Sequence, residues 1–306
     1  SDMTGEIITI QVGQCGNQVG KHFWSQLAKE HNIDRHGQGL TGDDRNTTRD
    51  DDTNPFFKLN DGYRYTPRAL MLDLEPSAIQ DVENYFPGMF DSRASWISPE
   101  ELGAGNSWSK GYDYGLANQD IFLNMIDKEI DATDNFEGFQ LLHSVAGGTG
   151  SGLGSSLLEA ISDRYPKKFL STYSVFPSSE SEVVIQPYNT VLTLRRLAEN
   201  SDASIVFDNN ALLNLTSKVF KDPYTSYLHT NQLISAAMSS ITNSIRFPSY
   251  MYNSLSSIFS TLIPTPELHF LIPGFTPFTS DYVIDGKEYK NNTPYDVLLD
   301  LFDGSS

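Results

Sequence analysis

Ala146-Gly-Gly-Thr-Gly-Ser-Gly152 decides the fold of this chain, because it joins a strand pattern to a helix pattern. Residues 140–145 before it form a short run that predicts a β-strand, and residues 151–164 after it have helical spacing. Glycines let successive backbone N–H groups converge on an anion, and the N-terminus of a following helix adds positive potential. The stretch therefore predicts a phosphate-binding loop and not a merely flexible turn.

Two better-known phosphate motifs do not fit this loop. Leu153-Gly154 stands where a Walker A loop needs Lys followed by Ser or Thr. Ser155 stands where a dinucleotide-binding fingerprint needs its third glycine. We therefore expect the phosphate charge to be met by backbone dipoles and a metal ion, without a lysine from the loop.

The same alternation of strand and helix extends to both sides of the loop. Predicted strands cover residues 6–12, 68–73, 140–145, 169–176 and 204–207. Predicted helices cover residues 19–30, 120–130, 151–164 and 189–198, and residues 13–18 are predicted as a loop. Such βα repeats favour an α/β fold with a mostly parallel sheet covered on both faces, in which ligands bind at the carboxyl ends of the strands.

The character of the chain changes between residues 223 and 266, which contain no Asp or Glu and only one Lys or Arg, Arg246. Residues 230–247 have a helical apolar stripe whose opposite face is small and uncharged, so we expect this helix to be enclosed. Residues 267–272 follow as a predicted strand of a second domain. The predicted division is a nucleotide-binding domain at 4–222, a central connecting helix at 223–247 and part of an α+β domain at 248–306, which looks cut short.

Composition narrows the class of protein. The 306 residues carry 21 Lys+Arg against 39 Asp+Glu, a net charge of −18, which speaks against nucleic acid or an anionic membrane as the main partner. A single cysteine, Cys15, excludes an internal disulfide framework and fits a reducing compartment. No apolar run approaches the roughly 18 residues of a membrane span. We therefore expect a soluble, acidic protein of the cytoplasm, and an acidic solvated loop around residues 41–53.

Four motifs together resemble the tubulin family. They are Gly13-Gln-Cys-Gly-Asn-Gln18, Asp73-Leu-Glu-Pro76, Gly103-Ala-Gly-Asn106 and the glycine loop, in the family's order and spacing. Residues 163–168 and 172–177 resemble the γ branch, and the spacing near residues 178–182 is similar to its fungal members. The resemblance runs from about Glu6 to about Leu301 and implies a Rossmann-like tubulin GTPase domain, a central helix and a partial intermediate domain of a C-terminally truncated chain.

The resemblance implies GTP or GDP as ligand, together with Mg²⁺. Gln14, Cys15 and Gln18 then line the nucleotide, although by residue type alone Cys15 would be an inert core thiol. Glu75 matches the family's acidic residue near the magnesium, acting through water, with Asp73 as its companion. One carboxylate is enough, because magnesium keeps several waters and binds phosphate oxygens.

Two further loops complete the phosphate side of the implied site. Ala104, Gly105 and Asn106 match the loop that senses the γ-phosphate, and Ser144 matches a contact just before the cradle. The cradle itself corresponds to Gly147, Gly148, Thr149, Gly150 and Ser151.

The implied base and ribose contacts lie later in the chain. Asn209 and Asn231 match the two asparagines whose amides read the guanine edge, and Tyr227 matches the aromatic that stacks on the base. Without the family, Asn209 would be an ordinary turn residue and Tyr227 core packing. Glu182 stands near the ribose-contacting acid, after a loop that is shorter than the family's.

One departure from the family concerns hydrolysis. Residues 248–257 match a loop that in α-tubulin supplies an acid to the nucleotide of the next subunit, and Ser257 stands in the acid's place. A serine cannot act there as a general base at neutral pH. We therefore expect no catalytic residue in this loop and at most slow GTP hydrolysis.

The resemblance implies a GTP-binding protein that nucleates microtubules in a γ-tubulin complex at a spindle pole body or other microtubule-organising centre. Its implied partners are γ-tubulin complex proteins, the αβ-tubulin dimer and lateral γ-tubulin neighbours, without nucleic acid or membrane. One rival is a self-polymerising GTPase like the bacterial homologue FtsZ, which would need carboxylates in residues 248–257. Another is an interaction module that has lost its nucleotide, which would have broken phosphate motifs.

Overall fold

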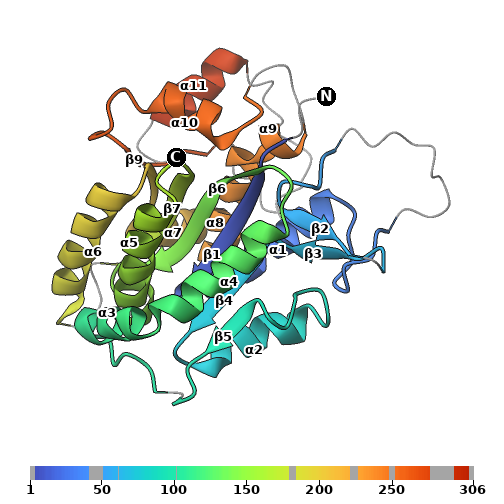
Figure 1. Ribbon diagram of the computed structural model, residues 1–306. Helices are drawn as coiled ribbons and strands as arrows, with labels where there is room; N and C mark the ends of the chain where they lie inside the picture. Colours follow the sequence, from blue (N-terminus) through green and yellow to red (C-terminus); the bar gives the residue numbers. More distant parts are fainter. Residues whose placement is uncertain are drawn as a thin grey trace.

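A seven-stranded sheet forms the centre of the computed structural model, which describes residues 4–40, 51–60, 62–100, 102–178, 184–220, 227–247, 252–275 and 293–302 (Figure 1). Its strand order is β5-β4-β1-β6-β7-β8-β9, and each neighbouring pair is parallel. The strands are β1 (Glu6–Val12), β4 (Ala69–Asp73), β5 (Ser95–Ile97), β6 (Phe136–Ser144), β7 (Phe169–Phe176), β8 (Ala203–Asp208) and β9 (Phe270–Leu271). A separate antiparallel pair consists of β2 (Phe57–Leu59) and β3 (Tyr65–Pro67).

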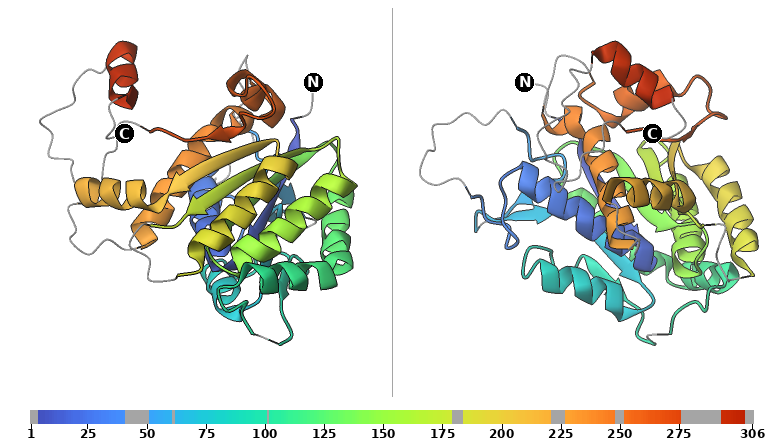
Figure 2. Two further views of the ribbon diagram at one scale, coloured as in Figure 1. Left: turned by 90° about the vertical axis from the view of Figure 1, so that its left-hand side faces the viewer. Right: turned by 180° about the vertical axis from the view of Figure 1, so that it is seen from behind.

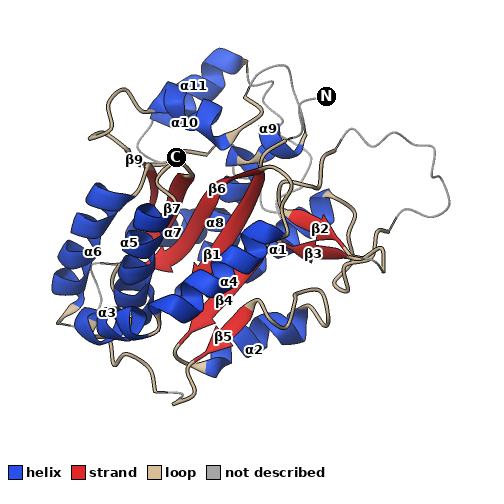
Figure 3. Ribbon diagram, in the orientation of Figure 1, coloured by secondary structure: helices blue, strands red, loops and turns tan. Residues whose placement is uncertain are grey.

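Helices cover both faces of this sheet (Figures 2 and 3). One face packs against α1 (Gly13–Glu30), α2 (Pro76–Tyr85), α7 (Asn209–Phe220) and α8 (Tyr227–Ile241). The other packs against α4 (Gln119–Asp131), α5 (Gly154–Arg164) and α6 (Gln186–Asn200), with α3 (Trp108–Ala117) beside α5. The remaining helices are η1 (Thr149–Leu153), a π-helical turn, and α9 (Asn243–Arg246), α10 (Leu255–Leu262) and α11 (Pro294–Phe302).

Strand β1 shows why the sheet is covered on both sides. All seven of its residues are buried, and alternate side chains enter different cores: Ile7 joins the core under α1, and Ile8 and Ile10 join the core under α5. A strand buried on both faces reads as a nearly continuous apolar run, as this one does. The predicted α/β fold with a mostly parallel sheet is therefore confirmed.

The prediction of a loop at residues 13–18 was wrong, because these residues form the first turns of α1. Gly13 has φ +73°, which turns the chain directly out of β1 into the helix. Gly16 lets that helix lie on the sheet, since a Cβ there would be 2.2 Å from the carbonyl oxygen of Leu142.

The helix predicted over residues 230–247 is interrupted, since α8 ends at Ile241 and α9 begins at Asn243. Between them lies the buried Thr242, whose hydroxyl donates to the carbonyl of Met238 at 3.0 Å, a back-bond that bends helices. The small face of α8 is enclosed in part: Ser235 and Ser239 are buried, whereas Ser240 is exposed.

Residues 267–272 were predicted as a strand, and a strand of two residues, Phe270–Leu271, does form there. Within this stretch β9 pairs parallel with β8, through Ser204 with Phe270 and Ile205 with Leu271, so it extends the central sheet. The predicted domain boundaries themselves stay a prediction.

Candidate functional site

The functional loops gather where the parallel strands end, which we call the carboxyl edge of the sheet. β1 ends at Val12 before α1, β4 ends at Asp73, β6 ends at Ser144 before the glycine loop, and β8 ends at Asp208. These ends lie in the lower part of Figure 1, and α9, α10 and α11 lie at the opposite, amino edge.

Two helix N-termini meet at the carboxyl edge. A Cβ on Gly13, the first residue of α1, would lie 2.9 Å from the backbone nitrogen of Gly150 in η1. The first N–H groups of a helix have no intrahelical acceptor and carry the positive end of the helix dipole. Two such ends in contact make a site suited to an anion, as a phosphate-binding loop requires.

Glycine is required inside this loop by close backbone approach. A Cβ on Gly150 would lie 2.8 Å from Ser144 Oγ, and Ser151 Oγ donates to the carbonyl of Gly147. At Gly147 the nearest atom to an added Cβ is Ser144 Oγ at 3.3 Å, so this position faces more open space. Ser144, Gly147, Thr149 and Gly150 thus lie together, as the sequence predicted for a cradle.

The loop at residues 103–107 packs directly against the glycine loop. A Cβ on Gly148 would lie 2.8 Å from both Ala104 Cβ and the backbone nitrogen of Ser107. Gly105 and Asn106 both have left-handed backbone conformations, with φ of +58° and +57°. Asparagine is among the few side chains that adopt this region readily. The structure therefore brings together the two loops that the family resemblance assigned to the phosphates.

The two acidic candidates differ in exposure. Asp73 is buried, and its Oδ1 accepts from the backbone N–H groups of Leu74 at 2.7 Å and Glu75 at 3.3 Å. Burial raises the pKa of Asp73 to about 6. Glu75 is exposed at the start of α2, and its Oε1 lies 2.0 Å from where a Cβ on Gly103 would be. Glu75 is thus the carboxylate that faces the 103–107 loop, and Asp73 points inward to its own turn.

The candidates on α1 follow the first turns of that helix. Gln14 is exposed, and Cys15 and Gln18 are half-buried. Burial raises the pKa of the Cys15 thiol to about 12, so it is neutral at pH 7 and packs as an apolar group against the core.

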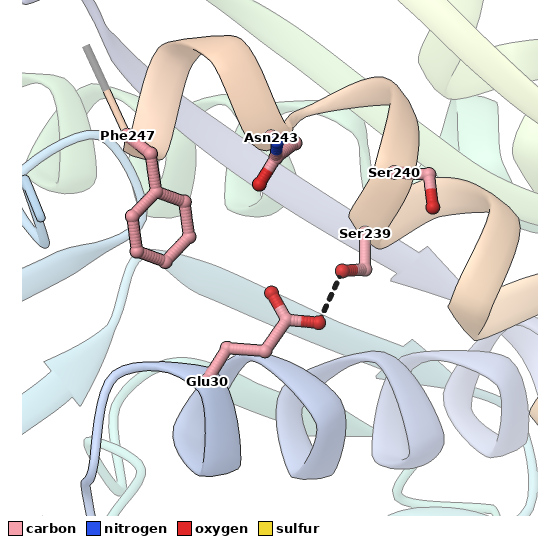
Figure 4. A pocket seen from close by; sticks show the side chains of 5 residues that line it. All are labelled: Glu30, Ser239, Ser240, Asn243 and Phe247. Carbon is pink, nitrogen blue, oxygen red and sulfur yellow. Dashed lines mark hydrogen bonds between the residues drawn. The ribbon is translucent and has the colours of Figure 1, made fainter. Parts of the chain in front are cut away.

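The candidates on α8 lie on a helix that packs beside α1 (Figure 4). Ser239 on α8 donates to Glu30 at the end of α1. Tyr227 is 71% exposed and is not core packing, whereas Asn231, one turn further, is buried. Asn209 is half-buried at the first position of α7, directly after β8. Glu182 lies outside the described residues.

Two residues that the sequence analysis did not single out belong to this edge. Asn189 on α6 hydrogen-bonds to both loops, donating to the carbonyls of Asn106 and Ala146. Lys110 on α3 has its Nζ 4.0 Å from where a Cβ on Gly105 would be, so one cation does reach the 103–107 loop. No sequence motif marks either residue, since each is brought in by a helix that packs beside the loops.

The loop that departs from the family lies at the other edge. Residues 248–251 are outside the described residues, but Ser254 and Ser257 form a capping box at the start of α10. The backbone N–H of Ser256 donates to Glu137 Oε1 at 3.3 Å, which fixes this helix start beside the beginning of β6. Ser257 therefore caps a helix at the amino edge, away from the glycine loop.

A cavity of about 430 Å³ also lies at the amino edge, between α1 and the end of α8 (Figure 4). Its lining consists of Glu30, Ser239, Ser240, Asn243 and Phe247. The Glu30 carboxylate is already paired with Arg246 NH1 at 2.6 Å, so this cavity offers no unbalanced charge to a ligand.

Two features are absent from the described part of the chain. No helix in it is both long and apolar enough to cross a membrane. In the same residues, no cluster of three or more His, Cys, Asp or Glu side chains could hold a metal ion.

Comparison with known proteins gives concordant matches. The sequence model of the Tubulin/FtsZ family GTPase domain matches residues 6–217. The chain is 73% identical over 301 residues to the tubulin gamma chain of Eremothecium gossypii, covering 98% of this chain and 64% of that protein. It is 71% identical to that of Candida glabrata over 301 residues, with 98% and 65% covered. For Saccharomyces cerevisiae the identity is 65% over 304 residues, with 99% and 64% covered. The chain thus spans about 64–65% of the length of these curated relatives.

Proposed function

This chain belongs to the tubulin family, as its resemblance to fungal γ-tubulins predicted, and we propose that it binds GTP or GDP at the carboxyl edge of its sheet. The observation that carries this proposal is the contact between the N-termini of α1 and η1 at Gly13 and Gly150. Their N–H groups and dipoles supply the positive potential that a phosphate chain needs, in a site where the loop itself holds no lysine.

The residues of the site divide by the part of the nucleotide they would hold. The phosphates would lie on residues 147–151, with residues 104–106 at the γ-phosphate and Ser144 beside them. Gln14, Cys15 and Gln18 would line the ligand from α1. The guanine would pair with Asn209 and Asn231 and stack on Tyr227, which has the exposed ring that stacking requires.

Magnesium fits the donor set near Glu75. Mg²⁺ takes oxygen ligands and keeps several waters, so Glu75 would hold it through water while phosphate oxygens complete the shell. Asp73 is a poorer partner, because its oxygen is engaged by two backbone N–H groups and its pKa is raised by burial. When bound, the metal would neutralise phosphate charge.

We further propose that the protein nucleates microtubules as part of a γ-tubulin complex at a microtubule-organising centre such as the spindle pole body. Its partners would be γ-tubulin complex proteins, the αβ-tubulin dimer and neighbouring γ-tubulins. The proposed nucleotide site and α10 lie at opposite edges of the sheet, so one edge is available to a tubulin dimer and the other to complex proteins. Ser257 is not an acidic residue, so the chain would not promote GTP hydrolysis in a neighbouring subunit through this loop. The chain itself would hydrolyse GTP slowly at most.

The first test is to denature the purified chain and identify the released nucleotide by chromatography. About one GTP per chain supports the site and slow hydrolysis. Mainly GDP supports the site but leaves the source of the GDP to be measured by single-turnover hydrolysis. No guanine nucleotide, together with no binding of added GTP, would overturn the proposal.

A further inference from the structure

Asn189 connects the two loops of the proposed site from a third element, α6. Its Nδ2 donates to the carbonyl of Asn106 at 2.7 Å and to the carbonyl of Ala146 at 2.9 Å. Its Oδ1 accepts from the backbone N–H of Trp108 at 3.1 Å. Asn189 is only 4% exposed, and it uses both of its N–H donors and one of the two acceptor positions on its oxygen.

The carbonyl groups that Asn189 holds are structurally important. Asn106 follows Gly105 in a second consecutive left-handed conformation, an arrangement that costs free energy unless its surroundings fix it. Ala146 begins the glycine loop. One amide group therefore fixes the end of the 103–107 loop relative to the start of the glycine loop, and it ties the N-terminus of α3 to both.

The contact between these loops leaves little room for independent movement. An added Cβ on Gly148 would be 2.8 Å from Ala104 Cβ, and one on Gly111 in α3 would be 2.4 Å from the carbonyl oxygen of Gly148. Trp108 is held a second time, by its Nε1 donating to Ser155 Oγ at 3.2 Å on α5. Among the described residues, the side chain of Asn189 hydrogen-bonds to both loops, whereas the Trp108 side chain reaches α5.

We infer that Asn189 is a positioning residue that sets the 103–107 loop for the γ-phosphate and so determines discrimination between GTP and GDP. This inference rests on the proposed nucleotide site. Asn189 acts through the backbone of Asn106 and Ala146 and touches no phosphate itself. Because GDP has no γ-phosphate, loss of the amide weakens GTP binding more than GDP binding.

The test measures the dissociation constants of GTP and GDP for the chain, Asn189→Ala and Asn189→Asp. Aspartate keeps the size of the side chain and the bond from Trp108 N–H, but it replaces the NH2 group, with its two donors, by one carboxylate oxygen that faces the two carbonyl oxygens. We expect GTP affinity to fall about tenfold or more in each variant, and GDP affinity to fall about threefold or less.

Matched controls come from the same helix. Asn200 donates to the carbonyl of Arg196 within α6 and does not reach the loops, so Asn200→Ala and Asn200→Asp are expected to keep the wild-type ratio of the two affinities. An equal fall for GTP and GDP in the Asn189 variants would overturn the inference and leave Asn189 a purely structural residue, as would no fall at all. An unaltered chain that binds neither nucleotide would overturn the proposed function itself.

A second measurement needs no substitution and serves if the variants do not fold. Amide hydrogen exchange is measured on the unaltered chain at the Trp108 N–H, which donates its hydrogen bond to Asn189 Oδ1. We expect slower exchange at residues 105–108 with GTP than with GDP. Equal exchange in the two states would contradict the inference.

Discussion

The two edges of the central sheet are built from different chemistry. At the amino edge, ion pairs hold the elements together: the buried Arg68 pairs with the buried Glu6 at 2.8 Å, and the buried Arg246 pairs with the half-buried Glu30 at 2.6 Å. At the carboxyl edge, glycines bring backbone against backbone. Among the described residues, no ion pair involves residues 103–107 or 144–151.

This difference shows how one sheet can be closed at one edge and open at the other. Arg246 is fully buried, and besides Glu30 its guanidinium donates to the carbonyl of Ser239 at 2.8 Å. Burial lowers the pKa of His31, so its neutral ring accepts from Arg246 through Nε2 and donates from Nδ1 to Asp51. The polar groups around Arg246 at the amino edge are thus paired with one another. The carboxyl edge keeps helix N-termini available, which is what a ligand site needs.

The largest effect is expected from breaking the amino edge. Arg246→Met leaves the Glu30 carboxylate without its cation, and we expect the free energy of unfolding to fall by about 3–5 kcal/mol in urea titration. Arg195→Met is the control, because Arg195 is 69% exposed and pairs only with Glu199, so its loss is expected to be below about 1 kcal/mol. Equal losses in the two variants would mean that the buried pair does not hold this edge.

Breaking the carboxyl edge is expected to affect ligand binding more than folding. Gly147→Asp places a carboxylate at the mouth of the glycine loop, and we expect nucleotide affinity to fall more than about 100-fold. Gly148→Asp should abolish binding too, but it would also push the 103–107 loop away, because its Cβ would be 2.8 Å from Ala104. Gly62→Asp is the control, at an exposed turn where an added Cβ would make only one contact, 3.4 Å from Asn60 Oδ1. Stoichiometric nucleotide in purified Gly147→Asp would contradict the site.

A smaller effect concerns the pH dependence of stability. Burial raises the pKa of Asp73 to about 6, so between about pH 4 and pH 6 the folded chain holds a proton that the unfolded chain has released. The free energy of unfolding therefore falls across that range as pH rises. Asp73→Asn removes this loss, and we expect it to stabilise the chain by about 1–3 kcal/mol at pH 7.5 and by less at pH 5.

The control for Asp73 is Asp208→Asn at the exposed end of β8. Asp208 also accepts a backbone N–H two residues on, from Asn210 at 2.9 Å. We expect this substitution to change the free energy of unfolding by less than about 0.5 kcal/mol at either pH. If Asp73→Asn raised the free energy of unfolding by the same amount at both pH values, the buried charge of Asp73 would not be the cause of the lost stability.

The smallest effect is expected from Lys110. Lys110→Gln removes the cation beside Gly105, and we expect GTP affinity to fall about two- to fivefold at low salt, with the difference lost at about 0.5 M salt. Lys128→Gln on the exposed surface of α4 is the control. A salt-independent loss would show that Lys110 acts by packing and not by charge.

Much of this architecture could be predicted from periodicity and turn residues. β1 and β7 have the predicted bounds, and the glycine loop lies between a strand and a helix as expected. Local patterns did not predict that α1 begins at Gly13, because a glycine-rich run reads as a loop until its contact with Leu142 is known. The interruption between α8 and α9 at Thr242 was missed for a similar reason. Serine and threonine bend a helix only where the surroundings favour hydrogen bonds from their hydroxyls back to the helix carbonyls.

The candidate site was predictable as a set of loops but not as a set of contacts. The motifs named Gly148 and Asn106, and the structure puts their loops together. Asn189 carries no motif, and an asparagine inside a helix pattern gives no sign that its amide bridges two distant loops. Contacts of this kind follow from tertiary packing, which a single sequence does not display.

The capping box of α10 has a consequence for how chains of this fold diverge. Ser257 carries no charge. It occupies the third helical position, where glutamate or glutamine is the usual partner of an N-cap serine such as Ser254. A mutation to glutamate would preserve the helix start, so folding does not impose the serine. A chain of this fold can therefore gain or lose an acid at this position without rebuilding α10.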